Sequence, residues 1–253
     1  MTDLDIKIIQ YYKNNFKITD ILNKLFISKS LIDRTLKKYN IKRDRITGPK
    51  PIIKININYF NKIDSEHKAY WLGFIMADGC VYKRKLGGLQ FSLNLSIKDK
   101  QIIYDFLKDI ESDHLPKYYK NDIRLKICNS VFCKNLTKFG IIGNKSRKIY
   151  VPKINKKLIN HFLRGYFDGD GSVYLHRKNI CFNITSASYK IVFYFKRLIS
   201  KITKSKSKIY CGKNNKFFRI SYEGNILCNK IYNYLYKNSN IYLNRKKIIF
   251  ETF

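Results

Sequence analysis

Acidic residues are scarce in this sequence, and their scarcity is the first clue to the partner of the chain. There are 18 Asp and Glu among 253 residues, against 51 Lys and Arg, for a formal net charge of +33. So large an excess indicates a polyanionic partner, with nucleic acid first and an anionic membrane surface second. Only four acids follow residue 122, and two of them, Asp168 and Asp170, stand together in FDGDGS. We expect these two to have a use.

Long apolar runs, paired cysteines and histidines are also scarce. No apolar run reaches the length of a membrane span, and the N-terminal MTDLDIKIIQ carries acids and lacks a secretory pattern, so no membrane partner is expected. The six cysteines form no C-x-x-C pair and there are four histidines, so no structural zinc site is expected. Scattered cysteines favour a reducing, intracellular compartment. The wealth of Ile, Lys, Asn and Tyr reflects an AT-rich genome of a host, an organelle or a virus.

One stretch occurs twice with the same internal spacing. It reads AYWLGFIMADGCVY from residue 69 and HFLRGYFDGDGSVY from residue 161. Each copy is an apolar run compatible with a helix, ends in Asp-Gly and is followed by a strand-like segment. Small residues stand four apart, as Gly73 and Ala77 in the first copy and as Gly165 and Gly169 in the second. Residues four apart share a helix face, so two helix backbones can approach closely there.

An aspartate directly follows each pair of small residues. Asp78 and Asp170 precede Gly79 and Gly171, which take the usual helix-stop position. If the helices pack through their small faces, the two carboxylates end side by side, where like charge and both helix dipoles disfavour them. A divalent, oxygen-ligated cation such as Mg²⁺ relieves both penalties. A single Asp-Gly is more often a plain helix-ending turn, but recurrence at one offset of 92 residues (78 to 170) favours a paired site.

WLGFIMADG and LRGYFDGDG resemble the two motifs of a LAGLIDADG homing endonuclease in length, small-residue positions and terminal Asp-Gly. The first copy has Met76 where the name motif has its first Asp, a position that varies in the family. The resemblance covers roughly residues 60–253. It implies a monomer with an internal pseudo-dyad that cuts long target sites in double-stranded DNA, encoded in a mobile intron or free-standing.

The resemblance also implies a cofactor and its ligands. Mg²⁺ or Mn²⁺ is expected to support cleavage, and Ca²⁺ is expected to bind without supporting it. Asp78 and Asp170 would hold the metal, joined by the backbone carbonyls of Ala77 and Gly169.

A lysine near each metal is a further feature that the resemblance implies. It comes from the basic segment after the last helix of each half, which is NKSRK at 144–148 and NRKK at 244–247. Lys145 and Lys246 are the first candidates for transition-state or water-network residues. The alternatives, since the segments have no unique register, are Lys148 and Lys247.

The order of the expected elements repeats after each motif helix. The expected strands are 80–84, 89–97 and 122–128 in the first half and 173–177, 180–186, 208–210 and 217–222 in the second; the expected helices are 99–110, 130–139, 189–202 and 225–236. This pattern predicts an α+β fold of tandem pseudo-symmetric αββαββα repeats, homing endonuclease-like, with halves at 64–150 and 151–253. Asp64 or Ser65 is expected to cap the first motif helix.

Residues 1–47 are expected to form a small all-α domain, followed by a linker over 48–63 that begins with GPKP. Expected helices at 4–14, 19–25 and 28–39 resemble a helix-turn-helix. A plain three-helix bundle with a solvated basic face is the alternative. The residues expected to face DNA in this domain are Ser28, Lys29, Ser30, Arg34 and Lys37.

The outward faces of the two sheets are expected to grip DNA in the major groove, where Arg or Lys reads guanine and Asn reads adenine. An ordinary solvated sheet face is the alternative for any one residue. The candidate contacts are Lys83, Arg84, Ser92, Asn94, Ser96, Arg124 and Lys126 in the first half and Arg177, Asn183, Thr185, Arg219 and Ser221 in the second.

The residues therefore favour a site-specific, metal-dependent double-strand DNA endonuclease. Two alternatives use the same scaffold. One is an RNA-binding maturase that helps an intron fold, which the charge also suits. The other is a catalytically inactive DNA-binding regulator, which the retention of both Asp78 and Asp170 disfavours.

Overall fold

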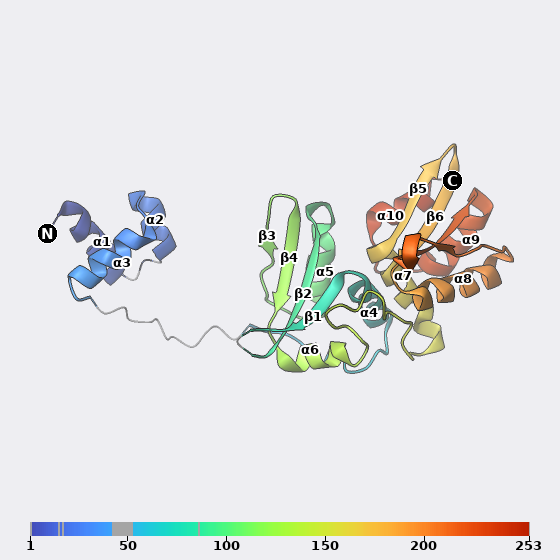
Figure 1. Cartoon of the computed structure of the whole chain (residues 1–253), viewed down its shortest axis with the longest axis horizontal. Coiled ribbons are helices and arrows are strands. Elements are labelled where there is room, and N and C mark those ends of the chain that lie inside the picture. Colours follow the sequence, from blue (N-terminus) through green and yellow to red (C-terminus); the bar gives the residue numbers. More distant parts are fainter. Residues whose placement is uncertain (1, 15, 17, 42–52, 86, 253) are drawn as a thin grey trace. The chain divides into compact units, whose positions relative to one another are not determined.

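The computed structural model describes residues 2–14, 16, 18–41, 53–85 and 87–252, in two compact units (Figure 1). The first unit is Met1–Ile52 and the second is Ile53–Phe253. The expected domain boundary at residue 47 and the first part of the expected linker, 48–52, lie outside the described residues. Residues 53–63 belong to the second unit, where Tyr59, Phe60 and Ile63 are buried, so they do not form a linker.

The first unit consists of three helices, α1 (Asp3–Lys13), α2 (Ile18–Leu25) and α3 (Lys29–Lys38). They pack around a small core of Ile8, Ile21, Ile32 and Leu36. A capping box begins α1, because Thr2 and Asp5 exchange hydrogen bonds at its first turn. Asp5 also accepts hydrogen bonds from Thr35 (3.1 Å) and Tyr39 (2.9 Å), which fasten α1 to α3. The bond from Tyr39 contributes most to lowering the pKa of the Asp5 carboxyl, to about 2.

The second unit contains two halves with the same order of elements. The first half comprises α4 (Glu66–Asp78), β1 (Gly79–Lys83), β2 (Leu89–Ser96), η1 (Ile97–Asp99), α5 (Lys100–Asp109), β3 (Lys117–Tyr118), β4 (Asp122–Ile127) and α6 (Ser130–Thr137). The second half comprises η2 (Lys156–Leu158), α7 (Ile159–Asp170), β5 (Gly171–His176), β6 (Asn179–Ser186), α8 (Tyr189–Thr203), β7 (Tyr210–Cys211), η3 (Lys213–Asn215), β8 (Phe218–Glu223), α9 (Asn225–Tyr236) and α10 (Asn244–Phe250).

Each half forms one antiparallel sheet, ordered β1-β2-β4-β3 in the first and β5-β6-β8-β7 in the second. The α+β class with tandem repeats is thus confirmed. The short strand β3 and the helix α10 were not expected. The sequence 244–250 carries two lysines and an arginine beside three apolar residues, which masked its helical pattern.

Each sheet buries one face against helices and leaves the other uncovered. On β2, Phe91, Leu93 and Leu95 are buried, while Asn94 and Ser96 on the opposite face are exposed. This strict alternation is what a strand with one solvated face requires. A single hydrophobic core runs through both halves.

The motif helices α4 and α7 pack against each other between the two sheets (Figure 1). Ser65 begins α4, since its Oγ accepts a hydrogen bond from the Lys68 amide (3.3 Å). A methyl group at Gly73 would lie 1.9 Å from the Phe162 carbonyl oxygen, and one at Gly165 would lie 1.9 Å from that of Tyr70. The two helix backbones are therefore in direct contact through their small faces, as the repeated spacing predicts.

The glycines after the two aspartates serve a different purpose from the one expected. Gly79 and Gly171 have φ values of −85° and −78°, so neither takes the left-handed conformation of a helix-ending glycine. Instead, a methyl at Gly79 would lie 2.8 Å from the Ile75 carbonyl oxygen, and one at Gly171 would lie 2.1 Å from the Phe167 ring. These positions lack a side chain because each strand starts tightly against its own motif helix.

Candidate active site

The structure brings together the ends of the two motif helices and their aspartates. Asp78 is the last residue of α4 and Asp170 is the last residue of α7. A methyl group at Gly169 would lie 2.4 Å from Cβ of Ala77 and 3.1 Å from Oδ2 of Asp78, so the ends of α4 and α7 touch at this point. Both aspartates are exposed to solvent. A pair of accessible carboxylates thus faces outward where the two halves meet.

The electrostatics of this junction disfavour two ionised carboxylates. Desolvation by the surrounding protein, and next the charge of Asp170, raise the pKa of Asp78 to about 6, while Lys246 and Lys145 oppose the shift. Desolvation also raises the pKa of Asp170, against a hydrogen bond from Tyr166 and the two lysines. Like charges close together in a partly desolvated place are the kind of pair that a cation stabilises.

Lys246 caps the C-terminal end of α7. Its ammonium donates to the carbonyl oxygens of Phe167 (2.7 Å), Asp168 (2.7 Å) and Gly171 (2.6 Å) and lies 3.5 Å from that of Gly169. The side chain is 3% exposed, and burial lowers its pKa to about 8. An ammonium has three protons, so the three short bonds use its donor capacity. Lys246 therefore neutralises the negative helix end and fixes the backbone that carries Asp170.

Lys145 lies at the C-terminal end of α4 and uses fewer of its hydrogen-bond donors than Lys246 does. Within the described part of the chain its ammonium donates to one protein acceptor, the Ala77 carbonyl (3.2 Å). It is 7% exposed, and burial lowers its pKa. The two lysines expected at the site thus both reach it, but in unequal environments. The alternatives lie elsewhere: Lys148 is exposed, and Lys247 lies over the Tyr242 ring (4.0 Å).

Asp168 lies in the same motif as Asp170 but points into the protein. It is 1% exposed and accepts hydrogen bonds from the hydroxyls of Tyr70 and Tyr236 and from the Leu243 amide (2.8 Å). Burial raises the pKa of both tyrosines well above the ordinary value, so their hydroxyls stay protonated and donate. Asp168 therefore joins α7 to α4 and α9. Its role is structural. Residues two apart on a helix face different sides, so Asp168 and Asp170 do not point in the same direction.

Met76 occupies the position in α4 that corresponds to Asp168 at the offset of 92 residues, and it is 2% exposed. The position is interior in both halves. A methionine there removes no outward-facing carboxylate, which explains why the first motif lacks this acid without losing Asp78.

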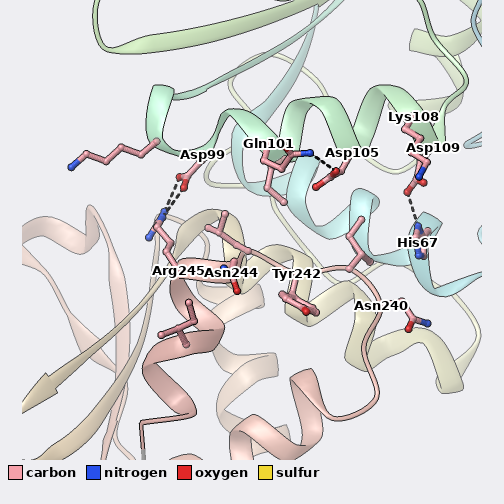
Figure 2. Close-up of a pocket in the computed structure, with 15 residues that line it drawn as sticks. His67, Asp99, Gln101, Asp105, Lys108, Asp109, Asn240, Tyr242, Asn244 and Arg245 are labelled. Atoms are coloured by element: carbon pink, nitrogen blue, oxygen red, sulfur yellow. Dashed lines mark hydrogen bonds and ion pairs between the residues drawn. The ribbon is translucent and has the colours of Figure 1, made fainter.

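Other polar residues that sequence reasoning missed fasten the two halves to each other. Arg164 is fully buried, pairs with Glu66 (2.8 Å) across the motif helices and donates to the Ile241 and Leu235 carbonyls. Arg245 makes a two-pronged ion pair with Asp99 (2.8 and 2.9 Å), visible in Figure 2. No local motif marks these pairs, whose members lie far apart in the sequence.

A cavity of about 620 Å³ lies between α5 and the segment 240–248. Figure 2 shows the residues that line it. His67, Asp105, Asp109 and Tyr242 are among its lining residues. Neither Asp78 nor Asp170 lines it. The cavity is therefore separate from the paired carboxylates.

The uncovered face of the first sheet carries most of the candidate DNA contacts of that half. Asn94 stands directly opposite Arg124, and Ser92 opposite Lys126. The Arg124 Nε donates to Asn94 Oδ1 (3.2 Å), and the guanidinium lies 4.9 Å over the Tyr119 ring. Ser96 extends the same face at the end of β2.

The second sheet repeats this arrangement. Arg219 stands opposite Thr185, donates to its Oγ1 (3.0 Å) and lies 5.6 Å over the Phe217 ring. Asn183 stands opposite Ser221, and Asn183 is largely buried. Each half therefore presents an arginine held by a cross-strand hydrogen bond and an aromatic ring.

Three candidates lie off these faces. Lys83 stands opposite Leu89 and shares the side of β1 that carries buried Val81, but it is itself exposed at the end of the strand, so its contact with DNA stays a prediction. Arg84 follows the end of β1, and Arg177 lies in the β5–β6 turn with φ 46°. The residues that the alternation places on the uncovered faces instead, and that the sequence reasoning missed, are Tyr82 and Tyr174.

The first unit presents the expected set of residues at its surface. Ser28, Lys29, Ser30, Arg34 and Lys37 are all exposed. Ser28 is the N-cap residue of α3, although its side chain makes no capping bond. Arg34 and Lys37 lie near Leu31 and Thr35 on one side of α3.

A duplicated α+β unit whose paired motif helices end in adjacent aspartates defines the class of this chain. Residues 157–245 match the family model of a LAGLIDADG-like domain. The second half of the chain is therefore similar to a LAGLIDADG-like domain, in agreement with the resemblance of the two motifs to that family. None of the helices in the described ranges has the length and apolar composition needed to cross a membrane.

Two archaeal sequences, both from Methanocaldococcus jannaschii, are similar to this chain. The uncharacterised protein MJ0314 is 26% identical over 195 residues, covering 74% of this chain and 72% of that protein. Replication factor C small subunit is 25% identical over 184 residues, covering 66% of this chain but 9% of that protein. Because the match covers so small a share of the replication factor subunit, the activity of that protein gives no information about this chain.

Solved structures of homing endonucleases are distantly similar. Meganuclease I-SmaMI bound to uncleaveable DNA gives a TM-score of 0.49 at 13% identity, covering 70% of this chain and 87% of that one. The LAGLIDADG homing endonuclease I-LtrWI bound to target DNA gives 0.44 at 17% identity, covering 78% and 91%. At these values the likeness carries no argument.

Proposed function

We propose that this chain is a site-specific endonuclease that cuts both strands of double-stranded DNA with a divalent metal ion held by Asp78 and Asp170. The observation that carries the proposal is the pair of exposed carboxylates at the junction of α4 and α7, flanked by Lys145 and Lys246. A chain of charge +33 that places two carboxylates together at its surface has a use for them there. One acid comes from each half, so one cut in each strand follows from the internal pseudo-symmetry.

The residues at the junction suit an oxygen-ligated divalent cation such as Mg²⁺ or Mn²⁺. Asp78 and Asp170 would supply carboxylate oxygens, and the carbonyls of Ala77 and Gly169 have a second lone pair besides the one that faces each lysine. The raised pKa of both carboxyls is the penalty that a cation offsets. A metal ion held there would supply an activated water and would stabilise the leaving oxygen of a phosphodiester. Ca²⁺ would bind the same oxygens without supporting cleavage.

The lysines at the junction and the arginines on the sheet faces would have different roles in the reaction. Lys145, with donor capacity left, would hold a water or a phosphate oxygen beside Asp78. Lys246 would act as a positioning residue, because its protons are used on the backbone that carries Asp170. Arg124 and Arg219, held by neighbours on the uncovered faces, would contact bases or phosphates on either side.

Lys145→Met is expected to slow cleavage at one strand with little loss of stability, so that nicked plasmid accumulates. Lys246→Met is expected to lower the thermal stability, by about 2 kcal/mol or more, because three buried carbonyls lose their donor. Nicked and linear products, followed over time beside a thermal melt, separate the two roles. Equal melting temperatures for the two variants, or a Lys145→Met variant that linearises plasmid at the parental rate, would contradict the assignment.

The first unit would add affinity or site choice as a monomeric chain binds its long target. Deleting residues 1–52 is expected to weaken DNA binding about tenfold, which is about 1.4 kcal/mol, and to leave some cleavage. The triple change Lys29→Ala, Arg34→Ala and Lys37→Ala should reproduce most of the loss, because these side chains are exposed and the unit keeps its core. Unchanged affinity in gel-shift titrations would refute the helix-turn-helix assignment and favour a plain bundle.

The test of the function uses the full chain and two DNA sources. One is DNA spanning the intron-free insertion site of the gene that hosts this reading frame. The other is a randomised duplex library, selected for binding in Ca²⁺ and then incubated in Mg²⁺ or in EDTA. The proposal expects both strands to be cut at one locus in Mg²⁺ and neither in EDTA. DNA that is bound but uncut would show a regulator, and binding of intron RNA alone would show a maturase.

A further inference from the structure

Three potential metal ligands converge at the far end of the β5–β6 hairpin. They are His176, the last residue of β5, Cys181 on β6 and Glu223, the last residue of β8. Their ligand atoms all lie within 4.8 Å of one another, and His176 Nδ1 is 3.3 Å from Glu223 Oε1. Five residue steps separate His176 from Gly171 at the paired aspartates, about 17 Å along an extended strand. The cluster is therefore distinct from the candidate active site.

The strand register holds the cluster in place. Cys181 stands directly between Tyr174 on β5 and Glu223 on β8, and His176 lies two residues beyond Tyr174 on the same face. The His176–Glu223 contact thus spans β6 where Cys181 points outward. The hairpin turn, Arg177-Lys178, has two positive φ values (46° and 69°), as in the tight two-residue turns that match the twist of a hairpin.

We propose that His176, Cys181 and Glu223 bind one Zn²⁺ ion, with water at the fourth position. Imidazole nitrogen, thiolate and carboxylate are the donors that zinc takes, at about 2.0–2.3 Å, which puts neighbouring ligand atoms about 3.4–3.6 Å apart in a tetrahedron. The 3.3 Å between His176 and Glu223 agrees with that spacing. The distances from Cys181 Sγ to the ligand atoms of His176 and Glu223 can shorten to the tetrahedral spacing if these two side chains rotate. Both are free to do so, because they are 55% and 52% exposed. A thiolate ligand disfavours Mg²⁺ and Ca²⁺, so this site is selective against the metals expected at the aspartates.

The distribution of acids in the second half supports a role for Glu223. Four acids follow residue 122. Asp168 is locked by two tyrosines, Asp170 ends α7, and Glu251 accepts from Tyr232 (2.6 Å). Glu223 instead lies exposed on the uncovered face and contacts His176 Nδ1 (3.3 Å), where a carboxylate opposes an approaching phosphate.

A bound Zn²⁺ would offset this charge, since two positive charges balance one thiolate and one carboxylate. It would also fasten the β5–β6 hairpin to β8, which stiffens the outer end of the sheet. The sequence alone predicts no zinc site because the ligands are 5 and 42 residues apart rather than in C-x-x-C form. The inference does not depend on the proposed nuclease function.

The experiment titrates the full, EDTA-stripped and desalted chain with Co²⁺ and then with Zn²⁺, without DNA. Co²⁺ bound by a thiolate gives a charge-transfer absorption, which Zn²⁺ should remove at one equivalent per chain. Cys181→Ser should abolish the absorption. Glu223→Gln, which keeps the thiol and changes an exposed side chain, should weaken Co²⁺ binding at least about tenfold.

Two control variants separate this site from the rest of the chain. Cys211→Ser removes an exposed cysteine of the same sheet, and Asp78→Asn removes an acid of the candidate active site. Both should keep the absorption of the parent. A parent without the absorption at millimolar Co²⁺, a Cys181→Ser variant that retains it, or a Glu223→Gln variant that binds as tightly as the parent would overturn the zinc site. None of these outcomes bears on cleavage.

Discussion

Asp78→Asn and Asp170→Asn are each expected to abolish double-strand cleavage while leaving DNA binding intact. Each change removes one of the two carboxylate charges proposed to hold the metal ion and keeps the size of the side chain. The loss should be about 10²- to 10³-fold or more, the range seen when one preorganised electrostatic group is removed from a transition state. Affinity should stay the same or rise slightly, because a negative charge leaves a phosphate-facing surface.

Two measurements are needed, a plasmid cleavage assay in Mg²⁺ and a gel-shift titration in Ca²⁺. Both use DNA that carries the target site selected from the duplex library. Asp113→Asn is a matched control, since it removes the same charge from an exposed loop away from the junction. It should cut at the parental rate. An Asp78→Asn or Asp170→Asn variant that cuts both strands like the parent would remove the metal-site assignment.

A second readout distinguishes lost chemistry from lost folding. The pKa of Asp78 is raised to about 6 in the folded chain, so ionising it costs stability. That cost is absent below the unfolded pKa of 3.8, grows as the pH rises through about 6, and is complete above it. Asp78→Asn should therefore melt higher than the metal-free parent at pH 8 and nearly the same at pH 4. The gain should be modest, because the carboxyl is exposed and water screens it.

The repeated motif made the paired helices and their aspartates predictable from sequence alone. Small residues four apart and an aspartate directly behind them leave few ways to pack two such helices. Strand alternation likewise predicted the uncovered faces, as at Ser92, Asn94 and Ser96. These features are local, because the period of a helix or a strand determines them.

Features that depend on contacts between distant segments could not be predicted from the sequence. Asp168 was expected to have a use, but the sequence does not show which, because its surroundings come from Tyr70, Tyr236 and Leu243, which no spacing connects to it. The difference in hydrogen bonding between Lys145 and Lys246 also depends on contacts between distant segments. The basic segments look alike, but only one of them continues into a helix, α10, whose backbone brings its lysine under the end of α7.

Gly165→Ala is expected to destabilise the second unit strongly. The added methyl would lie 1.9 Å from the Tyr70 carbonyl oxygen, 2.8 Å from its carbon and 2.9 Å from the Phe74 nitrogen. All three obstacles are backbone atoms of α4, which cannot rotate away as a side chain would. We expect a loss of about 3 kcal/mol or more, at the upper end for overpacking, even though alanine favours a helix by up to about 1 kcal/mol over glycine. For a unit of this size the loss corresponds to a melting temperature lower by about 6–12 °C.

Gly143→Ala is the matched control, since its added methyl would meet a single atom, the Val81 carbonyl oxygen, at 4.0 Å. It should melt within about 2 °C of the parent. Equal melting of the two variants would show that the motif helices do not pack through their small faces. The same packing holds the carboxylates together, because α4 and α7 can make room only by moving apart. Gly165→Ala should therefore lose cleavage more than DNA binding even below its melting temperature, which links the spacing of small residues in the motif to the chemistry at its end.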